Sequence, residues 1–371
     1  MSEHHKESCP NRLSRRHFLS AIGAASAGVV LAGCSKDSPT QPGSGDTTPD
    51  LPASSKVAVG EVKMYDFNTL KNKMTDMLDQ LGGLSDIIKS GDTVGMKINL
   101  TGGTGSADRW ERDTGVNAID SYWTHPQIVN VVGQLAKDSG ASKIVIVESY
   151  YDWESVGRFN FKTVADKLGA TIIQTNSAGP YTGFVKRDVG SKAFIYQELY
   201  QNAIFDEMDC FISLPKAKQH VSAGVTHAMK NLVGTLPQNM YSTNNSNRNA
   251  IHEHDNKLDK NPNSNLCRVI LDLNSATKIH LAVNDAIKTT IGGEGPWCNT
   301  MQNRTFNKLI ISKDVVAADT ISTQVIGFDP AAADYTDTFA LPSRPCINYL
   351  REAQNIGLGL NDLSRIEVIN V

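Results

Sequence analysis

Side chains able to hold an anion or to move a proton are concentrated between residues 214 and 231 of this 371-residue chain. The set comprises Lys216, Lys218, His220, His227, Lys230 and Asn231. Lysine ammonium groups bind carboxylate, phosphate or sulfate, and histidine can serve as acid, base or metal ligand. We predict that the lysines and Asn231 hold an anionic ligand, and that His220, His227 and Lys230 are catalytic.

The surrounding sequence indicates how these side chains could meet. We expect a buried strand over residues 210–214, and then a short helix over residues 226–233 that is capped by its first residue. His227, Lys230 and Asn231 are spaced i, i+3 and i+4, so they would share one helix face. Ligands of parallel α/β sheets bind beyond the carboxyl ends of the strands. The alternative interpretation is a solvated basic surface with two ordinary histidines.

Two glycine-rich stretches follow other expected strands. Lys97 and Asn99 precede the first stretch, and Gly293 and Gly295 lie in the second, beyond Asp285. Backbone N–H groups of such loops can approach an anion closely. We therefore predict that Lys97, Asn99, Gly293 and Gly295 contribute to the same ligand site, although simple turn structure is the alternative for the second loop.

The histidines could instead bind a divalent metal ion. The predicted ligands are His220, His227 and Asp285, and His252 with His254 form a further candidate pair. Residues i and i+2 of an extended segment point to one side, and imidazole with carboxylate suits zinc, iron, nickel or manganese. A polar surface loop is the alternative for that pair. The nearby lysines would repel a bare cation, so a metal there requires carboxylates or an anionic substrate as counter-charge.

Several common classes are disfavoured. The chain lacks a Walker sequence, a dinucleotide fingerprint and the G-x-S-x-G, H-E-x-x-H and C-x-x-C motifs. A formal net charge of −3 provides no basic excess for nucleic-acid binding. Beyond the N-terminal segment the cysteines are Cys210, Cys267, Cys298 and Cys346. They permit two disulfides in three pairings, but their wide spacing argues against a cysteine-ligated zinc or iron–sulfur site.

The pattern of apolar residues in the rest of the chain predicts alternating strands and helices. Hydrophobic residues make up 40% and charged residues 20%, as in folded globular proteins. We expect strands over 57–62, 93–98, 143–147, 171–174, 210–214, 279–283 and 309–311. We expect helices over 68–81, 126–139, 161–168, 226–233, 266–276 and 315–326, and a long polar loop over 237–265. This alternation predicts an α/β fold with a largely parallel sheet flanked by helices, in a single large domain over residues 56–371.

The N-terminus has the pattern of an export signal. Arg15 and Arg16 precede Phe-Leu and a mildly apolar stretch, which then ends in Leu-Ala-Gly-Cys at Cys34. The arginine pair resembles a twin-arginine signal, and the second motif resembles a lipobox. We predict a signal peptide over residues 1–33, lipidation of Cys34 and a flexible tether over 34–55. The protein would then be exported by the twin-arginine machinery and anchored in the cell envelope by lipid; a buried N-terminal helix is the alternative.

The ordered motifs resemble the DUF362 family, a bacterial and archaeal family without an assigned reaction. The strongest match runs through Leu-Pro-Lys-x-Lys-x-His from Leu214 and Lys-Asn-Leu-Val-Gly from Lys230. Supporting matches are Lys97-x-Asn99, Thr124-x-Pro126, Asp285-Ala286, Gly293-x-Gly295-Pro296 and Asp314 through Asp319. The resemblance implies a shared site between about residues 90 and 330. Ile98 stands where the family often has proline, and the clustered cysteines of many members are missing, so no iron–sulfur cluster is expected.

Two functions remain open on this sequence. The first is an exported, lipid-anchored enzyme that acts on an anionic small molecule, with or without a divalent metal. The second is a non-catalytic lipoprotein that binds an anionic solute or a cell-surface polymer, because the same lysines would serve it equally well. A redox partner is disfavoured by the missing cysteine cluster.

Overall fold

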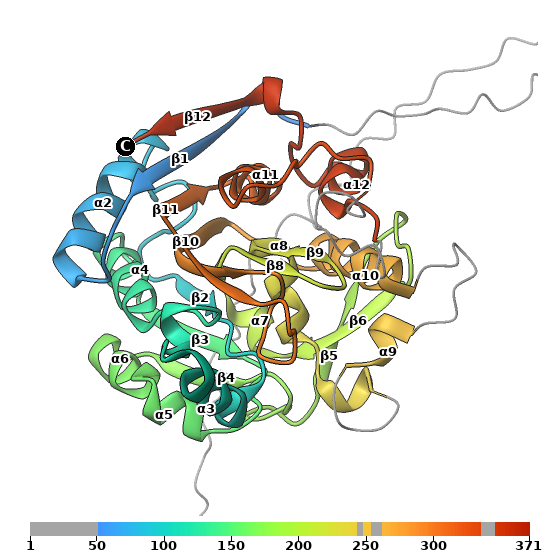
Figure 1. The fold of residues 1–371 in the computed structure, drawn as a ribbon, viewed down its shortest axis with the longest axis horizontal. Coiled ribbons are helices and arrows are strands. Elements are labelled where there is room, and N and C mark those ends of the chain that lie inside the picture. Colours follow the sequence, from blue (N-terminus) through green and yellow to red (C-terminus); the bar gives the residue numbers. More distant parts are fainter. Residues whose placement is uncertain (1–50, 243–247, 254–261, 335–345) are drawn as a thin grey trace, which may run out of the picture. The chain divides into compact units, whose positions relative to one another are not determined.

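The computed structural model describes residues 51–242, 248–253, 262–334 and 346–371 (Figure 1). These residues fall within one compact unit, Pro49–Val371. Its centre is an eight-stranded sheet in the order β12-β1-β11-β10-β7-β2-β3-β4. The strands are β1 (Ser55–Glu61), β2 (Thr93–Lys97), β3 (Lys143–Glu148), β4 (Thr171–Gln174), β7 (Cys210–Ser213), β10 (Leu281–Ile291), β11 (Gln302–Ser312) and β12 (Ile366–Asn370).

The sheet is mostly parallel. Strands β10, β7, β2, β3 and β4 run parallel in succession, and β12 is parallel to β1. Strand β11 is antiparallel to both of its neighbours. The predicted α/β class with a largely parallel sheet is confirmed, with β11 as the exception.

Helices cover both faces of the sheet (Figure 1). One face packs on α2 (Phe67–Gln80), α4 (Pro126–Asp138) and α6 (Phe161–Leu168), and the other on α8 (Ala228–Asn231), α10 (Pro262–Ala276), α11 (Val315–Val325) and α12 (Tyr349–Ile356). Strand β3 shows the alternation that makes this possible. Ile144 and Ile146 enter the core with α2 and α4, whereas Val145 and Val147 enter the core with α10 and α11. Successive side chains of a strand point to opposite faces, so an apolar run fills two cores.

Helix boundaries agree with local signals in most places. Helix α2 is capped by the Asp66 carboxylate, and α4 begins at Pro126 with the His125 ring accepting from the Gln127 N–H. The helix expected over 226–233 is shorter, because Thr226 pairs with Lys218 in a hairpin of β8 (Lys218–His220) and β9 (Gly224–Thr226). The predicted N-cap at Thr226 is therefore wrong, and His227 occupies that position in extended conformation.

Several elements were not expected from the sequence. They are α3 (Gly103–Thr114), α5 (Glu154–Arg158), α7 (Ile204–Glu207), α9 (Ala250–Glu253), α12, β12 and the β5–β6 hairpin (Phe184–Asp188 and Glu198–Asn202). Helix α3 replaces most of the first glycine-rich loop; it begins after Gly102, whose positive φ of 86° favours glycine. Its weak apolar pattern, with Ala107 and Trp110 as its buried apolar residues, explains why the helix was missed.

Cys210, Cys267, Cys298 and Cys346 are free thiols, so the disulfides that the sequence permits are not formed in this structure. Among the described helices, none has the length and apolar content needed to cross a membrane. The predicted signal peptide, Cys34 and most of the tether lie outside the described residues. Strand β1 begins at Ser55, one residue before the predicted start of the domain.

Candidate anion-binding site

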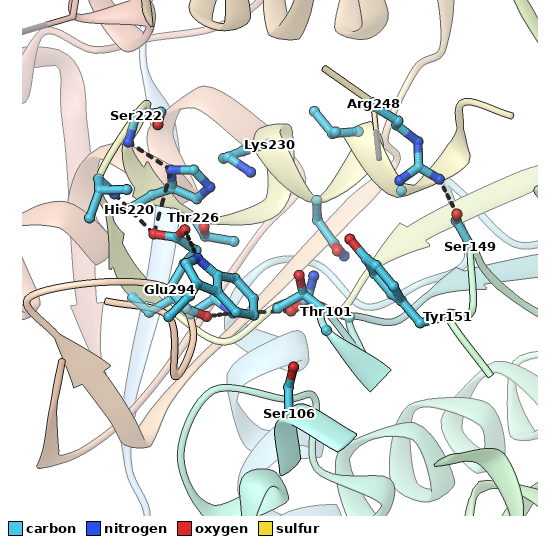
Figure 2. A pocket seen from close by; sticks show the side chains of 18 of the residues that line it. Thr101, Ser106, Ser149, Tyr151, His220, Ser222, Thr226, Lys230, Arg248 and Glu294 are labelled. Carbon is cyan, nitrogen blue, oxygen red and sulfur yellow. Dashed lines mark hydrogen bonds and ion pairs between the residues drawn. The ribbon is translucent and has the colours of Figure 1, made fainter. Parts of the chain in front are cut away.

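A cavity of about 600 Å³ opens where the chain leaves the carboxyl ends of β2, β3, β7 and β10 (Figure 2). These four strands are adjacent in the sheet, so the loops that follow them converge. The lining includes Asn99, Thr101, Ser106, Glu148, Ser149, Tyr151, Lys218, His220, Thr226, Lys230, Asn231, Arg248, His252, Glu294 and Trp297. The sequence-predicted residues Asn99, Lys218, His220, Lys230, Asn231 and His252 therefore meet in one place.

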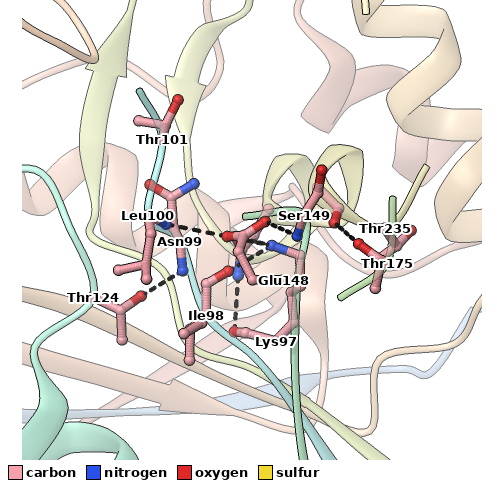
Figure 3. A network of polar contacts seen from close by, with 12 residues as sticks. Lys97, Ile98, Asn99, Leu100, Thr101, Thr124, Glu148, Ser149, Thr175 and Thr235 are labelled. Carbon is pink, nitrogen blue, oxygen red and sulfur yellow. Dashed lines mark hydrogen bonds and ion pairs between the residues drawn. The ribbon is translucent and has the colours of Figure 1, made fainter. Parts of the chain in front are cut away.

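A buried ion pair forms the floor (Figure 3). Lys97 Nζ lies 3.0 Å from Glu148 Oε2 and donates to Asn231 Oδ1 at 3.3 Å. The Glu148 carboxylate also accepts the Leu100 N–H at 3.1 Å and the Ser149 N–H at 2.6 Å. Burial lowers the pKa of Lys97, and Glu148 opposes that shift. Lys97 thus supports the cavity from below rather than lining it, and its charge is balanced.

Gly234 allows the backbone to lie against this pair. A Cβ atom built at Gly234 would stand 2.4 Å from Glu148 Oε1 and 2.6 Å from Lys97 Nζ. A side chain at this position would displace one of the two charged groups.

Lys218 is held by oxygen atoms on three sides. Its Nζ donates to Asn99 Oδ1 at 3.1 Å, to the Tyr122 carbonyl at 2.7 Å and to the Glu294 carbonyl at 3.2 Å. Burial lowers the pKa of Lys218 to about 7. All three ammonium hydrogens have acceptors, so this side chain ties together the loops after β2, β7 and β10.

His220 and Glu294 lie next to each other in the cavity wall. Glu294 accepts the Val221 N–H at 3.0 Å and the Trp297 Nε1–H at 2.7 Å, and His220 Nδ1 lies 3.8 Å from Glu294 Oε2. Burial alone would raise the pKa of Glu294, but these donors and the Lys230 charge lower it to about 2. Burial lowers the pKa of His220, and its Nδ1 accepts the Ser222 N–H at 3.0 Å. This hydrogen bond assigns the proton of a neutral ring to Nε2.

Two cations face the cavity without an ion pair to an acidic side chain of the described residues. From a longer distance, Glu294 opposes the burial that lowers the pKa of Lys230, and Glu148 does the same for Arg248. Lys230 is half-buried and makes no hydrogen bond or ion pair with them. Arg248 donates to the Leu236 carbonyl at 2.7 Å, to Asn176 Oδ1 at 3.0 Å and to Ser149, all of them neutral groups. Burial lowers the pKa of Lys230 to about 8. Figure 2 shows Lys230 and Arg248 on one side of the cavity, with Thr101 and Tyr151 on the other.

Lys216 and Asp285 belong to a different cluster. Lys216 Nζ lies 2.7 Å from Asp285 Oδ2, and the Tyr65 hydroxyl contacts both groups. The Tyr65 ring stacks on His125 with centroids 3.7 Å apart. Lys216 and Asp285 are almost fully buried and do not line the cavity. The predicted placement of both residues at the ligand site is corrected: β10 extends past Asp285, which neutralises Lys216 inside the fold.

The predicted metal set is not assembled. His227 is fully buried and its Nε2 lies 3.1 Å from Thr323 Oγ1, away from the cavity lining. Burial lowers the pKa of His227 to about 3. Because the backbone of His227 is extended, this residue does not share with Lys230 the helix face that the i, i+3 spacing predicts. In the part of the chain that the structure describes, no group of three or more His, Cys, Asp or Glu side chains could hold a metal ion. His254, of the second candidate pair, lies outside that part.

Gly293 and Gly295 do not line the cavity, but they allow its wall to form. A Cβ at Gly295 would stand 2.2 Å from the Trp297 ring, and one at Gly293 would stand 2.3 Å from Cys298 Cβ. The loop therefore folds tightly and directs Glu294 inward. The Gly-x-Gly motif indicated this loop, but the side chain that lines the cavity is that of Glu294, between the two glycines.

Sequence reasoning also missed Glu148, Arg248 and Trp297. Glu148 is the last residue of β3, one position beyond the expected strand end, which is the usual place for a ligand-facing group. Arg248 lies in the polar segment that the sequence predicts to be a loop, and nothing in its local sequence distinguishes it.

Comparison with known proteins gives a family but no reaction. The sequence model of a family described as "Domain of unknown function (DUF362)" matches residues 112–324, more than half of the chain. A protein of Synechocystis sp. described as thylakoid-associated is 25% identical over 269 residues, which are 72% of this chain and 73% of that protein.

Proposed function

This chain belongs to the DUF362 family, and we propose that it binds an anionic small molecule in the cavity at the carboxyl ends of β2, β3, β7 and β10. One observation carries the proposal: Lys230 and Arg248 line the cavity and form no ion pair with an acidic side chain of the described residues, while Glu294 and Glu148 act on them only from beyond ion-pair distance. The other buried cations of the region are satisfied, Lys97 by Glu148 and Lys218 by three oxygen atoms. An anion entering the cavity would supply the missing counter-charge.

The dimensions and walls of the cavity support a small organic ligand. A volume of about 600 Å³ lies in the range of sites for metabolite-sized molecules. Trp297 is 45% exposed, yet its ring is held by Glu294 and lies close over Gly295. An exposed aromatic face in the cavity that Lys230 and Arg248 also line would favour a ligand with a flat or apolar portion in addition to its anionic group.

We further propose that the protein is exported and anchored by lipid on Cys34. The support is the arginine pair at Arg15 and Arg16 and the Leu-Ala-Gly-Cys motif. The description of the Synechocystis relative as thylakoid-associated agrees with a membrane location for that protein. In this setting the ligand would be an anionic solute of the cell envelope.

The anion site is tested by calorimetric titration with sodium sulfate at constant ionic strength. Arg248→Gln and Lys230→Met should each weaken sulfate binding about tenfold, the loss of about 1.4 kcal/mol expected for one charge-assisted contact. Arg304→Gln and Lys162→Met are matched controls, because both residues are exposed and outside the cavity lining. Equal sulfate affinity in all four variants would overturn the assignment.

A further inference from the structure

Lys230 differs from the other lysines of the region in having a free amine. Lys97 is paired with Glu148, Lys216 with Asp285, and Lys218 has three oxygen acceptors. Burial lowers the pKa of Lys218 to about 7, but its nitrogen lies among three oxygen atoms, so the lone pair of a neutral amine there would face an acceptor rather than a ligand. Lys230 meets no such acceptor among the described residues, so its nitrogen can lose a proton without breaking a contact there.

The burial of Lys230 favours that loss. Burial lowers its pKa most, Glu294 opposes the shift, and the cations Lys97 and Arg248 add to it. The amine also faces the cavity rather than the protein interior, so a ligand can reach it. A desolvated lysine near other cations is the usual setting of an amine nucleophile.

The same cavity contains the groups that a carbonyl reaction needs. Arg248 can donate to a carboxylate through Nη1, since Nε and Nη2 already donate to Leu236, Ser149 and Asn176, and the neutral His220 ring can donate through Nε2–H. We propose that Lys230 forms an imine with the carbonyl group of an oxo acid whose carboxylate is bound by Arg248. This inference rests on the proposed anion-binding function and names the class of ligand.

The chemistry balances without an oxidant or a reductant. The neutral Lys230 nitrogen forms a bond to the carbonyl carbon, and the π electron pair moves to oxygen, which takes up the proton lost by nitrogen. The nitrogen then forms the C=N bond while the C–O bond breaks. The hydroxyl leaves with the second proton of the amine as one molecule of water.

Reductive trapping tests the step on the full chain. The protein is incubated with pyruvate and sodium cyanoborohydride at pH 8, and modified lysines are identified by peptide mass spectrometry. At this pH about half of an amine with a pKa near 8 is neutral, against less than about 1% of an ordinary lysine. We expect Lys230 to be modified at least about tenfold faster than the exposed Lys162, and sulfate to slow the reaction by competing for Arg248.

Two variants separate imine formation from anion binding. Lys230→Arg keeps the cation and should retain sulfate binding but lose the pyruvate adduct. Arg248→Gln should retain the amine and lower the trapping rate. If sulfate binds but Lys230 reacts no faster than Lys162, the imine is refuted and the anion site stands. If pyruvate marks Lys230 and sulfate fails to bind, the nucleophile is supported and the anion site is refuted.

Discussion

Replacing Glu148 by glutamine should destabilise the fold more than any change at an exposed ion pair. The side chains of Lys97 and Glu148 are 0% and 5% exposed, and their charged atoms lie 3.0 Å apart. Glutamine removes the negative charge but leaves the Lys97 ammonium buried. Breaking a buried pair by removing one partner costs about 3–5 kcal/mol.

The hydrogen bonds of Glu148 indicate that Glu148→Gln lowers the free energy of unfolding by about 4 kcal/mol, near the middle of that range. The carboxylate serves Lys97 and two backbone N–H groups, those of Leu100 and Ser149. Glutamine has one acceptor oxygen, so its amide must face at least one of these donors. Lys97→Met should cost less, about 3 kcal/mol, because the remaining carboxylate keeps both backbone donors.

The double variant measures the pair itself. Lys97→Met with Glu148→Gln leaves no unpaired charge, so its cost should fall at least about 2 kcal/mol short of the sum of the single costs. The control is Glu198→Gln, which breaks the exposed Lys186–Glu198 pair and should cost less than about 1 kcal/mol.

Equilibrium unfolding in urea, followed by tryptophan fluorescence, gives these values. With a urea dependence of about 3 kcal/mol/M, a loss of 4 kcal/mol lowers the midpoint by about 1.3 M. A cost below about 1 kcal/mol for Glu148→Gln would place this pair with ordinary surface pairs. Additive single costs would refute the reasoning equally, since they would mean that the two charges do not stabilise each other.

Three further results are expected. Sulfate affinity should fall as pH rises through about 8, because Lys230 is charged below its pKa and neutral above it. The decrease should be at most about one log unit of affinity per pH unit. The sulfate affinity of Lys230→Arg, measured by the same titration, should not change over this pH range. Asp285→Asn should lower the free energy of unfolding by about 3 kcal/mol or more in urea, since it leaves a buried lysine unpaired, while calorimetry shows unchanged sulfate affinity. Cys34→Ser should move the exported protein from the membrane to the soluble fraction, and continued sedimentation with membranes would contradict lipid anchoring.

Local signals were sufficient for most of the elements that carry the site. Strands β2, β3 and β7 begin at the predicted residues and end within one residue of the predicted ends. Apolar periodicity and capping residues act within a few positions, so they can be read without knowledge of the fold. The same reasoning failed at the β8–β9 hairpin, where pairing between Lys218 and Thr226 replaced the first turn of the expected helix.

The position of a residue just beyond a strand was also informative. Asn99 and Lys218 follow β2 and β7 and both line the cavity. Residue type alone did not predict which side chains line the cavity. Lys216 is two positions from Lys218 but pairs with Asp285 inside the fold, and His227 contacts Thr323 in the core. Which direction each side chain takes depends on strand pairing, which the local sequence does not specify.

The sequence by itself determined the alternation of strands and helices and the collection of lysines at one edge of the sheet. Only the tertiary structure decided which of those charges remain available. The charge of Lys97 is balanced by a residue 51 positions away and that of Lys216 by one 69 positions away. Lys230 and Arg248 form no ion pair with an acidic side chain of the described residues. A buried charge is stabilised by whatever group the fold places within a few ångströms, so the free cations of a site can be identified only after the distant segments have been brought together.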